Sequence, residues 1–404
     1  MQSGRRSPLR VLVAGGGVAA FEATLALRAL AEERVSVELL APEADFTYRP
    51  LAVAEPFRAG EVRRFPLQAL AREAGAELRR GAVVSVDPHR RVVATREGEE
   101  LSYDVLLLAL GSRPREAVPN ALTFCGPEDG PAFGALLEEA VTGDVRSLAF
   151  ALPAGVAWPL PLYELALLTA NYLTDRGAMG AEVTVVTPED APLGLFGRAA
   201  SGAIRELLEI RGIVLRVRTT PVSFELGALQ VVPEGRIEAD RVVALPRFEG
   251  PRIPGVPHDG EGFVRTDEHG RVTGLDDVYA AGDLTQFPVK QGGIAAQQAD
   301  AAAEAIAVQA GAPVEPTPFR PVLRGLLLTG MFPRYLRGEV GKDVSTESTE
   351  ALWWPPAKIV GRHLARFLAA RMGLSESPPR LERESAVRVE VELDPRQAGA
   401  WPPI

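Results

Sequence analysis

The sequence predicts an α/β fold that contains two strand–helix–strand units followed by a smaller C-terminal α+β segment. The first unit spans residues 9–43 and the second spans residues 146–189, and in each a short apolar run precedes a helical pattern and a second apolar run. Buried parallel strands appear in a sequence as continuous apolar runs of this length. A chain of 404 residues, 46% of them hydrophobic, is long enough for two or three such domains.

A glycine-rich turn joins the first strand to the first helix in "LRVLVAGGGVAAFEATLALRAL" (residues 9–30). Gly15, Gly17 and Ala20 form the pattern G-x-G-x-x-A, with Gly16 inside it. Glycine permits the tight turn and lets backbone N–H groups approach a pyrophosphate, and the N-terminus of the helix adds favourable partial charge. Because strand, turn, helix and next strand occur in this order, the pattern predicts a Rossmann-like dinucleotide-binding domain.

The acidic residue that usually binds the ribose in such a domain is displaced here. It normally ends the second strand, where this chain has Ala41. Glu43 follows two residues later and is our candidate for the ribose hydroxyls. The alternative, that Glu43 is a solvated turn residue, stays open.

The later segments indicate where the domains begin and end. Short strands and charged turns fill residues 81–114, and the second unit continues to about residue 248. A strand, a loop and a helix follow in residues 270–306, and residues 313–321 are rich in proline. We therefore expect a discontinuous first domain, a second domain and a C-terminal hairpin and helix region, with the limits 1–115 plus 270–312, 116–269 and 313–404.

Two further segments resemble the flavin-binding motifs of flavoproteins that have two dinucleotide-binding domains. "TDEHGRVTGLDDVYAAGD" ends in Gly282 and Asp283, and "YDVLLLALGSRP" has Leu110 and Gly111 where the family has Thr-Gly. Over residues 8–310 the chain is similar to glutathione-reductase-type flavoproteins. The resemblance implies two Rossmann-like domains that bind FAD, with Asp283 on the ribityl chain rather than in a helix cap. It also implies further cofactor-binding residues in the first domain: Arg49, Pro50 and Val83.

Within this group the chain is most similar to type II NADH dehydrogenases and sulfide:quinone oxidoreductases. "PVKQGGIAAQQAD" resembles the Lys-x-Gly loop of the sulfide enzymes and the helix that follows it. The resemblance implies that Lys290 and the helix N-terminus at Gly292 and Gly293 stabilise negative charge on the reduced flavin. The alternative for Lys290 is a surface charge, although lysine occurs only at positions 290, 342 and 358.

The second unit lacks the turn that would bind a second nucleotide. NADH-using relatives begin this unit with G-x-G-x-x-G-x-E, whereas the chain has "AWPLPLYE", in which only Glu164 matches. Pro159 and Pro161 offer no N–H group to a phosphate, and Trp158 fills the space that a pyrophosphate needs. We therefore expect the unit to serve as a scaffold, with weak or absent NAD(P)H binding.

Two side chains near the expected flavin have open roles. If the correspondence holds, Glu164 relays protons to a reduced acceptor; the alternative is a carboxylate in the first turn of a helix, where the macrodipole favours it. The sulfide enzymes pass sulfur between paired cysteines, but Cys125 is the only cysteine of this chain. We expect Cys125 to be a small packed residue.

These features predict an FAD-dependent oxidoreductase that moves electrons from a small-molecule donor to a quinone-like acceptor. Two alternatives stay open: an NAD(P)H:acceptor oxidoreductase similar to type II NADH dehydrogenases, and a flavin-binding redox sensor without enzymatic activity. A formal net charge of −9 argues against nucleic acid as a partner, and four histidines without ligand spacing argue against a metal site. The single cysteine favours a reducing, cytoplasmic location.

The C-terminal region contains an amphipathic pattern. "PPAKIVGRHLARFLAARMG" (residues 355–373) has an apolar stripe at helical spacing, basic residues beside it, and Trp353 and Trp354 in front. One interpretation is peripheral contact of residues 353–372 with the inner face of an anionic membrane. The other is that the stripe packs on the flavin domain or on a second subunit, so that a homodimer also stays open. The stripe comprises Ile359, Val360, His363, Leu364, Phe367 and Leu368.

Overall fold

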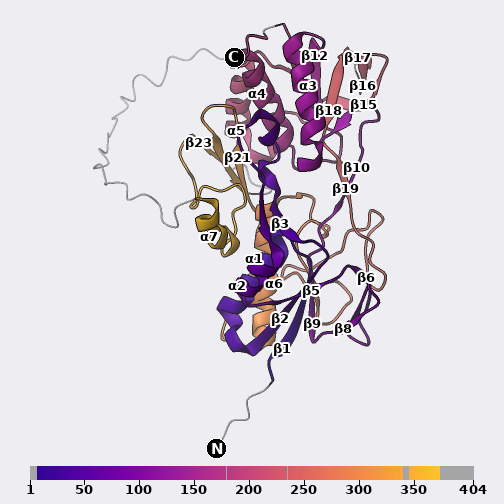
Figure 1. The fold of residues 1–404 in the computed structure, drawn as a ribbon, viewed down its shortest axis with the longest axis vertical. Coiled ribbons are helices and arrows are strands. Elements are labelled where there is room, and N and C mark those ends of the chain that lie inside the picture. Colours follow the sequence, from indigo (N-terminus) through magenta and orange to yellow (C-terminus); the bar gives the residue numbers. More distant parts are fainter. Residues whose placement is uncertain (1–6, 179, 234, 340–344, 374–404) are drawn as a thin grey trace, which may run out of the picture.

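Two parallel sheets lie at opposite ends of an elongated molecule, with the C-terminal elements beside them (Figure 1). The structure is a computed structural model that describes residues 7–178, 180–233, 235–339 and 345–373. It confirms the predicted fold class, which is two Rossmann-like α/β domains with a C-terminal α+β segment. The first six residues and the tail from residue 374, which the expected domain limits include, lie outside the described residues.

The first sheet has five parallel strands in the order β20-β9-β1-β2-β5. Val11 and Val13 of β1 pack against the helices α1 and α6, whereas Leu12 and Ala14 face the antiparallel sheet β6-β7-β8. Both faces of β1 are therefore buried, which explains its continuous apolar run. The bounds are β1 Leu9–Ala14, β2 Val35–Ala41, β5 Glu77–Arg80, β9 Val105–Leu108, β20 Val278–Ala280, α1 Val18–Ala31 and α6 Gly292–Gln309.

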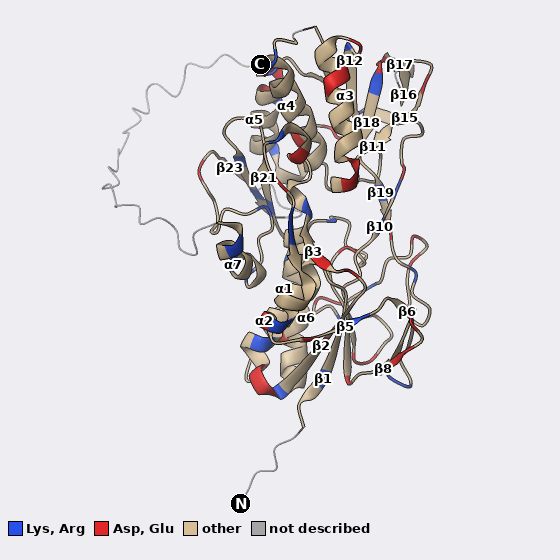
Figure 2. Ribbon diagram, in the orientation of Figure 1, with Lys and Arg blue, Asp and Glu red and all other residues tan. Residues whose placement is uncertain are grey.

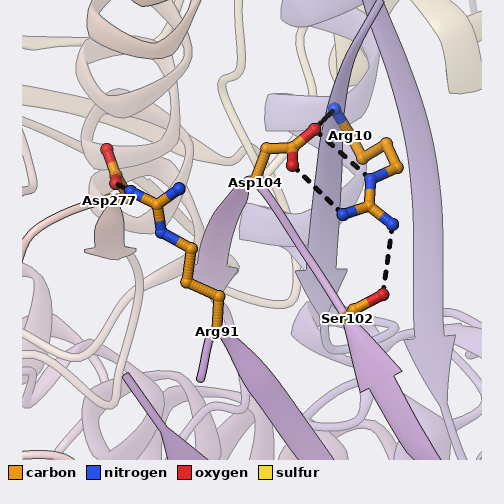
Figure 3. Close-up of polar contacts among 5 residues, drawn as sticks. All are labelled: Arg10, Arg91, Ser102, Asp104 and Asp277. Atoms are coloured by element: carbon orange, nitrogen blue, oxygen red, sulfur yellow. Dashed lines mark hydrogen bonds and ion pairs between the residues drawn. The ribbon is translucent and has the colours of Figure 1, made fainter. Parts of the chain in front are cut away.

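The antiparallel sheet β6-β7-β8 is fastened to the first sheet by polar side chains (Figure 3). The Nη2 atom of Arg10 lies 3.1 Å from Asp104 Oδ1, and its Nη1 atom donates to Ser102 Oγ at 3.1 Å. Arg91 and Asp277 form a second ion pair. The remaining elements of this domain are β3 Asp45–Tyr48, β4 Arg63–Pro66, α2 Leu67–Ala74, β6 Val83–Asp87, β7 Val92–Thr95 and β8 Glu100–Ser102.

The second sheet repeats the parallel arrangement in the order β11-β18-β12-β13-β14. Helices α3, α4 and α5 and the antiparallel sheet β15-β16-β17 accompany it. The helices are α3 Gly130–Thr142, α4 Leu160–Asp175 and α5 Arg198–Ile210. The strands are β11 Leu122–Thr123, β12 Ser147–Ala151, β13 Glu182–Val186, β14 Val214–Arg216, β15 Thr220–Glu225, β16 Ala228–Val232, β17 Gly235–Glu238 and β18 Arg241–Ala244.

A two-stranded antiparallel ribbon, β10 (Arg113–Arg115) with β19 (Arg247–Glu249), connects the two domains. The boundary between the domains after β19 differs from the expected one. The expected limits place residues 250–269 in the second domain. In the structure Ile253, Val256 and Val264 pack in the core of the first domain with Leu12. The chain therefore returns to the first sheet directly after β19.

The C-terminal region forms a three-stranded antiparallel sheet, β21-β22-β23, which contains the expected hairpin. The helix expected over residues 355–373 is much shorter, since α7 covers only Leu364–Ala369. The side chain of Glu22 accepts hydrogen bonds from the backbone N–H groups of His363 and Leu364 and so fixes where the helix begins. The strands are β21 Val322–Leu327, β22 Arg334–Glu339 and β23 Ser345–Ser348.

The apolar stripe of this region packs inside the protein. Ile359, Leu364 and Leu368 are buried in one cluster with Phe21 of α1 and Leu39 of β2. This result favours the packing interpretation over the membrane interpretation. Among the described residues, none of the helices has both the length and the apolar character needed to cross a bilayer. Acidic and basic residues are intermixed over the described parts of both domains (Figure 2).

Short 3-10 helices join several of these elements. One of them, Arg49–Leu51, carries two residues of the expected cofactor site. Their bounds are Glu32–Arg34, Arg49–Leu51, Glu55–Phe57, Pro127–Asp129, Gly194–Phe196 and Ala370–Met372.

Candidate functional site

The glycine-rich turn lies at the carboxyl end of β1, where it leads into α1. A Cβ atom on Gly15 would lie 2.2 Å from the carbonyl oxygen of Ala109, so that only glycine fits beside the end of β9. A Cβ atom on Gly17 would meet nothing within 4 Å. Gly17 is also the N-cap of α1, and it supplies no side-chain cap to the first N–H groups of the helix. The turn therefore offers open space and backbone donors together, as a pyrophosphate requires.

Glu43 lies directly beside this turn. A Cβ atom on Gly16 would be 3.3 Å from Glu43 Oε2, and the Glu43 side chain is exposed. Ala20 is fully buried in the core between α1 and α6, where a larger residue would separate the helix from its neighbours. The structure thus gathers Gly15, Gly16 and Glu43 at one end of the sheet, with Ala20 as a packing residue.

The ends of β9 and β20 bring the two flavin-motif segments to the same edge. Gly111 and Gly282 have φ angles of 70° and 88°, in the left-handed region that favours glycine. The Gly282 N–H donates to Gln298 Oε1 of α6 at 2.8 Å, and a Cβ atom on Gly282 would lie 3.2 Å from Ala19 Cβ. The segment therefore runs close to the first turn of α1. Leu110 and Val83 are partly buried, and each packs against the core of the first domain.

A cavity of about 410 Å³ opens between the two domains and the C-terminal sheet. Asp283 lines it, and burial raises the pKa of this carboxyl group, against the opposing effects of Lys290 and Arg49. Several of the expected cofactor-binding residues meet there, but the glycine turn, Glu43, Val83, Leu110 and Gly111 do not border it. The expected residues in its wall are Arg49, Pro50, Glu164, Asp283, Lys290 and Gly292.

Lys290 is held in the wall of this cavity and is not a free surface charge. Its Nζ atom donates to the carbonyl oxygens of Thr285 at 2.6 Å and Phe287 at 2.9 Å. The same atom lies 3.8 Å from the ring centroid of Phe263, a cation–π distance. Burial lowers the pKa of Lys290 to about 8, although nearby acidic groups, Asp283 first among them, oppose this shift.

The N-terminus of α6 faces the cavity beside Lys290. Gln291 caps the helix, since its Oε1 atom accepts from the Ile294 N–H at 2.8 Å and its Nε2 atom donates to the Arg324 carbonyl at 3.0 Å. A Cβ atom on Gly292 would lie 3.0 Å from Ile359, so that the C-terminal segment packs directly on the helix end. The positive end of the helix dipole and the Lys290 ammonium group therefore act on the same space.

Glu164 forms a buried ion pair with Lys358 in another wall of the cavity. The Lys358 Nζ atom lies 2.6 and 2.7 Å from the two carboxylate oxygens of Glu164. It also donates to the Pro50 carbonyl at 3.1 Å, and the Leu328 N–H donates to Glu164 Oε1 at 2.9 Å. Burial raises the pKa of Glu164, and the charge of Lys358 opposes that rise. Glu164 is the fifth residue of α4, so the alternative of a first-turn carboxylate is wrong.

The turn of the second unit is closed by apolar side chains. The ring of Trp158 packs at 5.7 Å on that of Phe196, and Pro159 and Pro161 stand at the start of α4. The acidic residue after β13 is also engaged, because Tyr163 Oη donates to Glu189 Oε2 at 2.6 Å. A groove of about 850 Å³ nevertheless runs past Pro159, Glu189 and the first turn of α5.

Cys125 lies in the wall of the cavity with an exposed side chain, so the expectation of a packed residue is wrong. Its backbone N–H donates to Asp129 Oδ2 at 2.7 Å, which fixes the loop. Desolvation by the surrounding walls, together with Asp129 and Glu128, raises the pKa of the thiol to about 11. The thiol is therefore protonated at neutral pH and is a poor nucleophile.

The comparison with protein families agrees with this geometry. The model for pyridine nucleotide-disulphide oxidoreductases matches residues 9–136 and 165–305. The chain belongs to the pyridine nucleotide-disulphide oxidoreductase family. The interval between the two matched stretches contains Trp158, Pro159, Pro161 and Glu164, which is the part of the chain that departs from the nucleotide-binding pattern.

Relatives in this family support the resemblance seen in the sequence. The chain is 29% identical to the sulfide-quinone reductase of Aquifex aeolicus over 49% of its own length and 47% of that protein's length. It therefore spans about half of that relative. It is 26% identical to a ferredoxin–NAD(+) reductase subunit of the Pseudomonas putida benzene 1,2-dioxygenase system, over 70% of this chain and 68% of that protein.

Two solved structures share the fold of this chain. The sulfide:quinone oxidoreductase of Aquifex aeolicus superposes with a TM-score of 0.76 at 18% identity, over 84% of this chain and 87% of that one. The NDH2 structure from Plasmodium falciparum gives a TM-score of 0.65 at 11% identity, over 84% of this chain and 91% of that one.

Sequence reasoning missed Lys358 as a site residue, because it placed this lysine on the basic face of a helix. One signal was available, since two of the chain's three lysines, Lys290 and Lys358, line the same cavity. Lysine is so rare here that each one is a candidate for a specific role. The capping role of Gln291 and the cavity positions of Phe124 and Arg324 had no comparable signal.

Proposed function

We propose that the chain is an FAD-dependent oxidoreductase that passes electrons from a small-molecule donor to a quinone-like acceptor in the cavity. The observation that carries this proposal is the buried Glu164–Lys358 pair in the wall of the cavity that Asp283, Lys290 and the N-terminus of α6 share. Reduction of a quinone requires two protons as well as two electrons. A buried carboxyl–ammonium pair beside the acceptor can hold and deliver such protons.

The residues of the first domain fit an FAD molecule in an extended conformation. Gly17 leaves open space at the uncapped start of α1, where the pyrophosphate would lie. Glu43, beside Gly16, would bind the ribose, and Asp283 would bind the ribityl chain. FAD, when bound, supplies the acceptance and return of an electron pair. Lys290 and the α6 N-terminus would stabilise the negative charge that this chemistry places at the flavin.

The residues around the cavity have separable tasks in this mechanism. Lys358 keeps Glu164 in place through two short contacts and is itself held by the Pro50 carbonyl. Trp158 and Phe124 present apolar surface that would exclude water and hold a planar acceptor. Burial raises the pKa of Glu164 while the charge of Lys358 opposes the rise, and a carboxyl group in such an environment is a candidate for proton transfer to a bound acceptor.

The test is a two-step reductant and oxidant screen on purified protein. The protein should be yellow and release FAD on denaturation. Its flavin should be reduced by dithionite and then reoxidised within seconds by a soluble benzoquinone or naphthoquinone under anaerobic conditions. The same enzyme with Glu164→Gln should be reoxidised at least about 100-fold more slowly. Colourless protein that does not take up FAD, or equal reoxidation of both proteins, would contradict the proposal.

The groove of the second unit favours NAD(P)H as a second candidate donor. It has about 850 Å³ of space beside Glu189, and a relative is named a ferredoxin–NAD(+) reductase subunit. Against this, Pro161 offers no N–H group, and Glu189 is already bonded to Tyr163. We therefore expect stopped-flow mixing with NADH or NADPH to reduce the flavin over minutes. Reduction in milliseconds at micromolar nucleotide would establish the second candidate instead.

A further inference from the structure

Glu22, Asp300 and His363 meet on the side of the first domain that is covered by the C-terminal segment. They come from α1, from α6 and from the residue before α7. One ligand-type atom of each residue lies within 4.8 Å of those of the other two. The His363 Nε2 atom is 3.9 Å from Asp300 Oδ1, too far for a hydrogen bond. No step of the proposed function uses these residues.

Two atoms of this cluster are buried without a hydrogen-bond partner in the described part of the chain. They are Asp300 Oδ1 and His363 Nε2, the same two atoms that face each other. Buried polar atoms are normally satisfied, and each exception needs a physical explanation. A cation between the two atoms would satisfy both.

The two carboxyl groups of the cluster are within hydrogen-bond reach of each other, so that either a shared proton or a cation has to relieve their repulsion. Glu22 is fully buried, and the Asp300 side chain is 14% exposed. The guanidinium group of Arg362, next to His363 in the chain, is bonded to Glu304 at 2.9 Å. Backbone N–H groups of His363 and Leu364 donate to Glu22 at 2.7 and 2.8 Å, but each carboxylate oxygen retains a second lone pair. Two carboxyl groups therefore lie together in the protein with no positive charge bonded to either in the described residues.

The imidazole of His363 is suited to be a ligand. Its Nε2 atom is buried, has no hydrogen-bond partner in the described part of the chain and faces Asp300. An imidazole nitrogen with a free lone pair is a common metal ligand. The backbone at Gly361 also passes close to the cluster, because a Cβ atom on Gly361 would lie 2.2 Å from Glu22 Oε2.

We propose that Glu22, Asp300 and His363 bind a divalent transition-metal ion that ties the C-terminal segment to α1 and α6. Zinc bonds to imidazole nitrogen and carboxylate oxygen are about 2.0–2.2 Å long, so that two ligand atoms of a tetrahedral ion lie about 3.4 Å apart. The Asp300–His363 distance of 3.9 Å would therefore have to shorten by about 0.5 Å on binding. The other ligand atoms, all within 4.8 Å of one another, would move by up to roughly 1.4 Å.

The ligand set indicates which ion binds. Imidazole suits zinc, iron, nickel and copper, and carboxylate suits manganese as well. Magnesium and calcium prefer oxygen ligands alone and keep several waters, for which a buried site with one histidine is unsuitable. Zn²⁺ and Mn²⁺ are therefore the ions of choice. The site is structural, because it lies apart from the residues that line the cavity.

The experiment uses the FAD-loaded full-length protein, treated with a chelator and dialysed. It is titrated with Zn²⁺ alone and with Mn²⁺ alone, and binding is measured by calorimetry and by competition with a coloured chelator. We expect one ion per chain and a rise in the unfolding temperature. His363→Gln and Asp300→Asn should weaken the binding at least about 100-fold, since loss of even an outer-shell partner costs 10–100-fold. The matched control, His258→Gln, removes an exposed histidine and should change nothing.

The outcomes separate the metal site from its alternatives. Far-UV circular dichroism and FAD content show whether each variant is folded. If His363→Gln does not fold, the near-isosteric Asp300→Asn is used to test metal binding. Anomalous scattering at the zinc edge from wild-type crystals should give a peak between the three side chains. Absence of stoichiometric metal binding, or equal metal affinity in wild type and His363→Gln, overturns the proposal. A proton shared between the carboxyl groups of Glu22 and Asp300 would then hold the cluster together. The result is independent of whether quinones reoxidise the flavin.

Discussion

The ammonium group of Lys358 lies 2.6 Å from the carboxylate of Glu164, although 194 residues separate them in the chain. The two side chains are 7% and 1% exposed. A buried charge is tolerated when it is paired and hydrogen-bonded, and both partners here have additional backbone contacts. The pair therefore joins α4 of the second domain to the C-terminal segment in the wall of the cavity.

Breaking this pair from one side should be costly. Lys358→Met leaves an uncompensated buried carboxylate, and we expect a loss of about 3–5 kcal/mol in the free energy of unfolding. Glu164→Leu leaves a buried ammonium group with a similar effect. Denaturant titration of both single variants and of the double variant measures the coupling free energy between Glu164 and Lys358. The double variant should be more stable than either single one, and simple additivity would show that the two residues do not interact.

Gly17 provides a test of the cofactor site that does not disturb the fold. Because a Cβ atom there meets nothing within 4 Å, Gly17→Ala and Gly17→Glu should both fold. Gly17→Glu places a negative side chain where the pyrophosphate would lie and should weaken FAD binding about 100-fold or more, a loss of roughly 2.7 kcal/mol. Gly134→Glu is the control, since Gly134 of α3 also has open space. The measurement is the FAD content of each variant after gel filtration, and an equal FAD content in Gly17→Glu and Gly134→Glu would contradict the prediction.

Lys290 should give the stability of the FAD-free protein a recognisable pH dependence. Its pKa is about 8 in the folded protein and near 10.5 in the unfolded chain. Between these values the unfolded chain binds more protons, so the free energy of unfolding rises with pH, by at most about 1.4 kcal/mol per unit. Below pH 8 the contribution is constant. The difference in the free energy of unfolding between wild type and Lys290→Met, measured from pH 7 to 10.5, isolates the contribution of Lys290. A difference that does not change with pH would contradict the prediction.

Cys125 should be dispensable for electron transfer. Its thiol has a pKa of about 11, and it is the only cysteine of the chain. Cys125→Ser should bind FAD, accept electrons and be reoxidised by quinone at rates within about twofold of wild type. Iodoacetamide should react slowly at pH 7.5 and faster as the pH approaches 11. A Cys125→Ser protein that binds FAD but cannot be reduced would show a direct role for the thiol.

The C-terminal segment should be required for folding and not for membrane attachment. Truncation after Glu350 removes Ile359, Leu364 and Leu368 from the core that they share with Phe21. The truncated protein should lose its cooperative unfolding transition, observed by calorimetry. Full-length protein should stay in the supernatant with anionic vesicles at low salt. Salt-sensitive pelleting that disappears in a folded truncated protein would favour the membrane interpretation.

Local features of the site were readable from the sequence. The glycine turn at Gly15 to Gly17, the turn at Gly282 after β20 and the helix start at Gly292 all depend on residues close together in the chain. Their backbone requirements are visible as residue types, because glycine suits tight turns and close approaches of the backbone. Whether Glu43, Asp283 and Lys290 contact the cofactor stays a prediction.

Long-range partners were not readable in the same way. Periodicity shows which face of an element is apolar, but not which surfaces meet. The helical pattern of residues 355–363 was overridden because Glu22, from another element, caps the chain at His363 and Leu364. Lys358 then extends toward Glu164 instead of lying on a basic helix face. The return of residues 250–269 to the first domain was missed for the same reason.

The distance in sequence between Glu164 and Lys358 has a consequence for biosynthesis. At 5–20 residues per second, the ribosome completes the second residue roughly 10–40 s after the first. During this interval the residues of α4 have been synthesised, but the cavity wall that Lys358 and Ile359 supply has not. The cavity is therefore completed late in translation. A nascent chain that has already made the glycine turn therefore lacks one wall of the cavity until residues 358 and 359 have been synthesised.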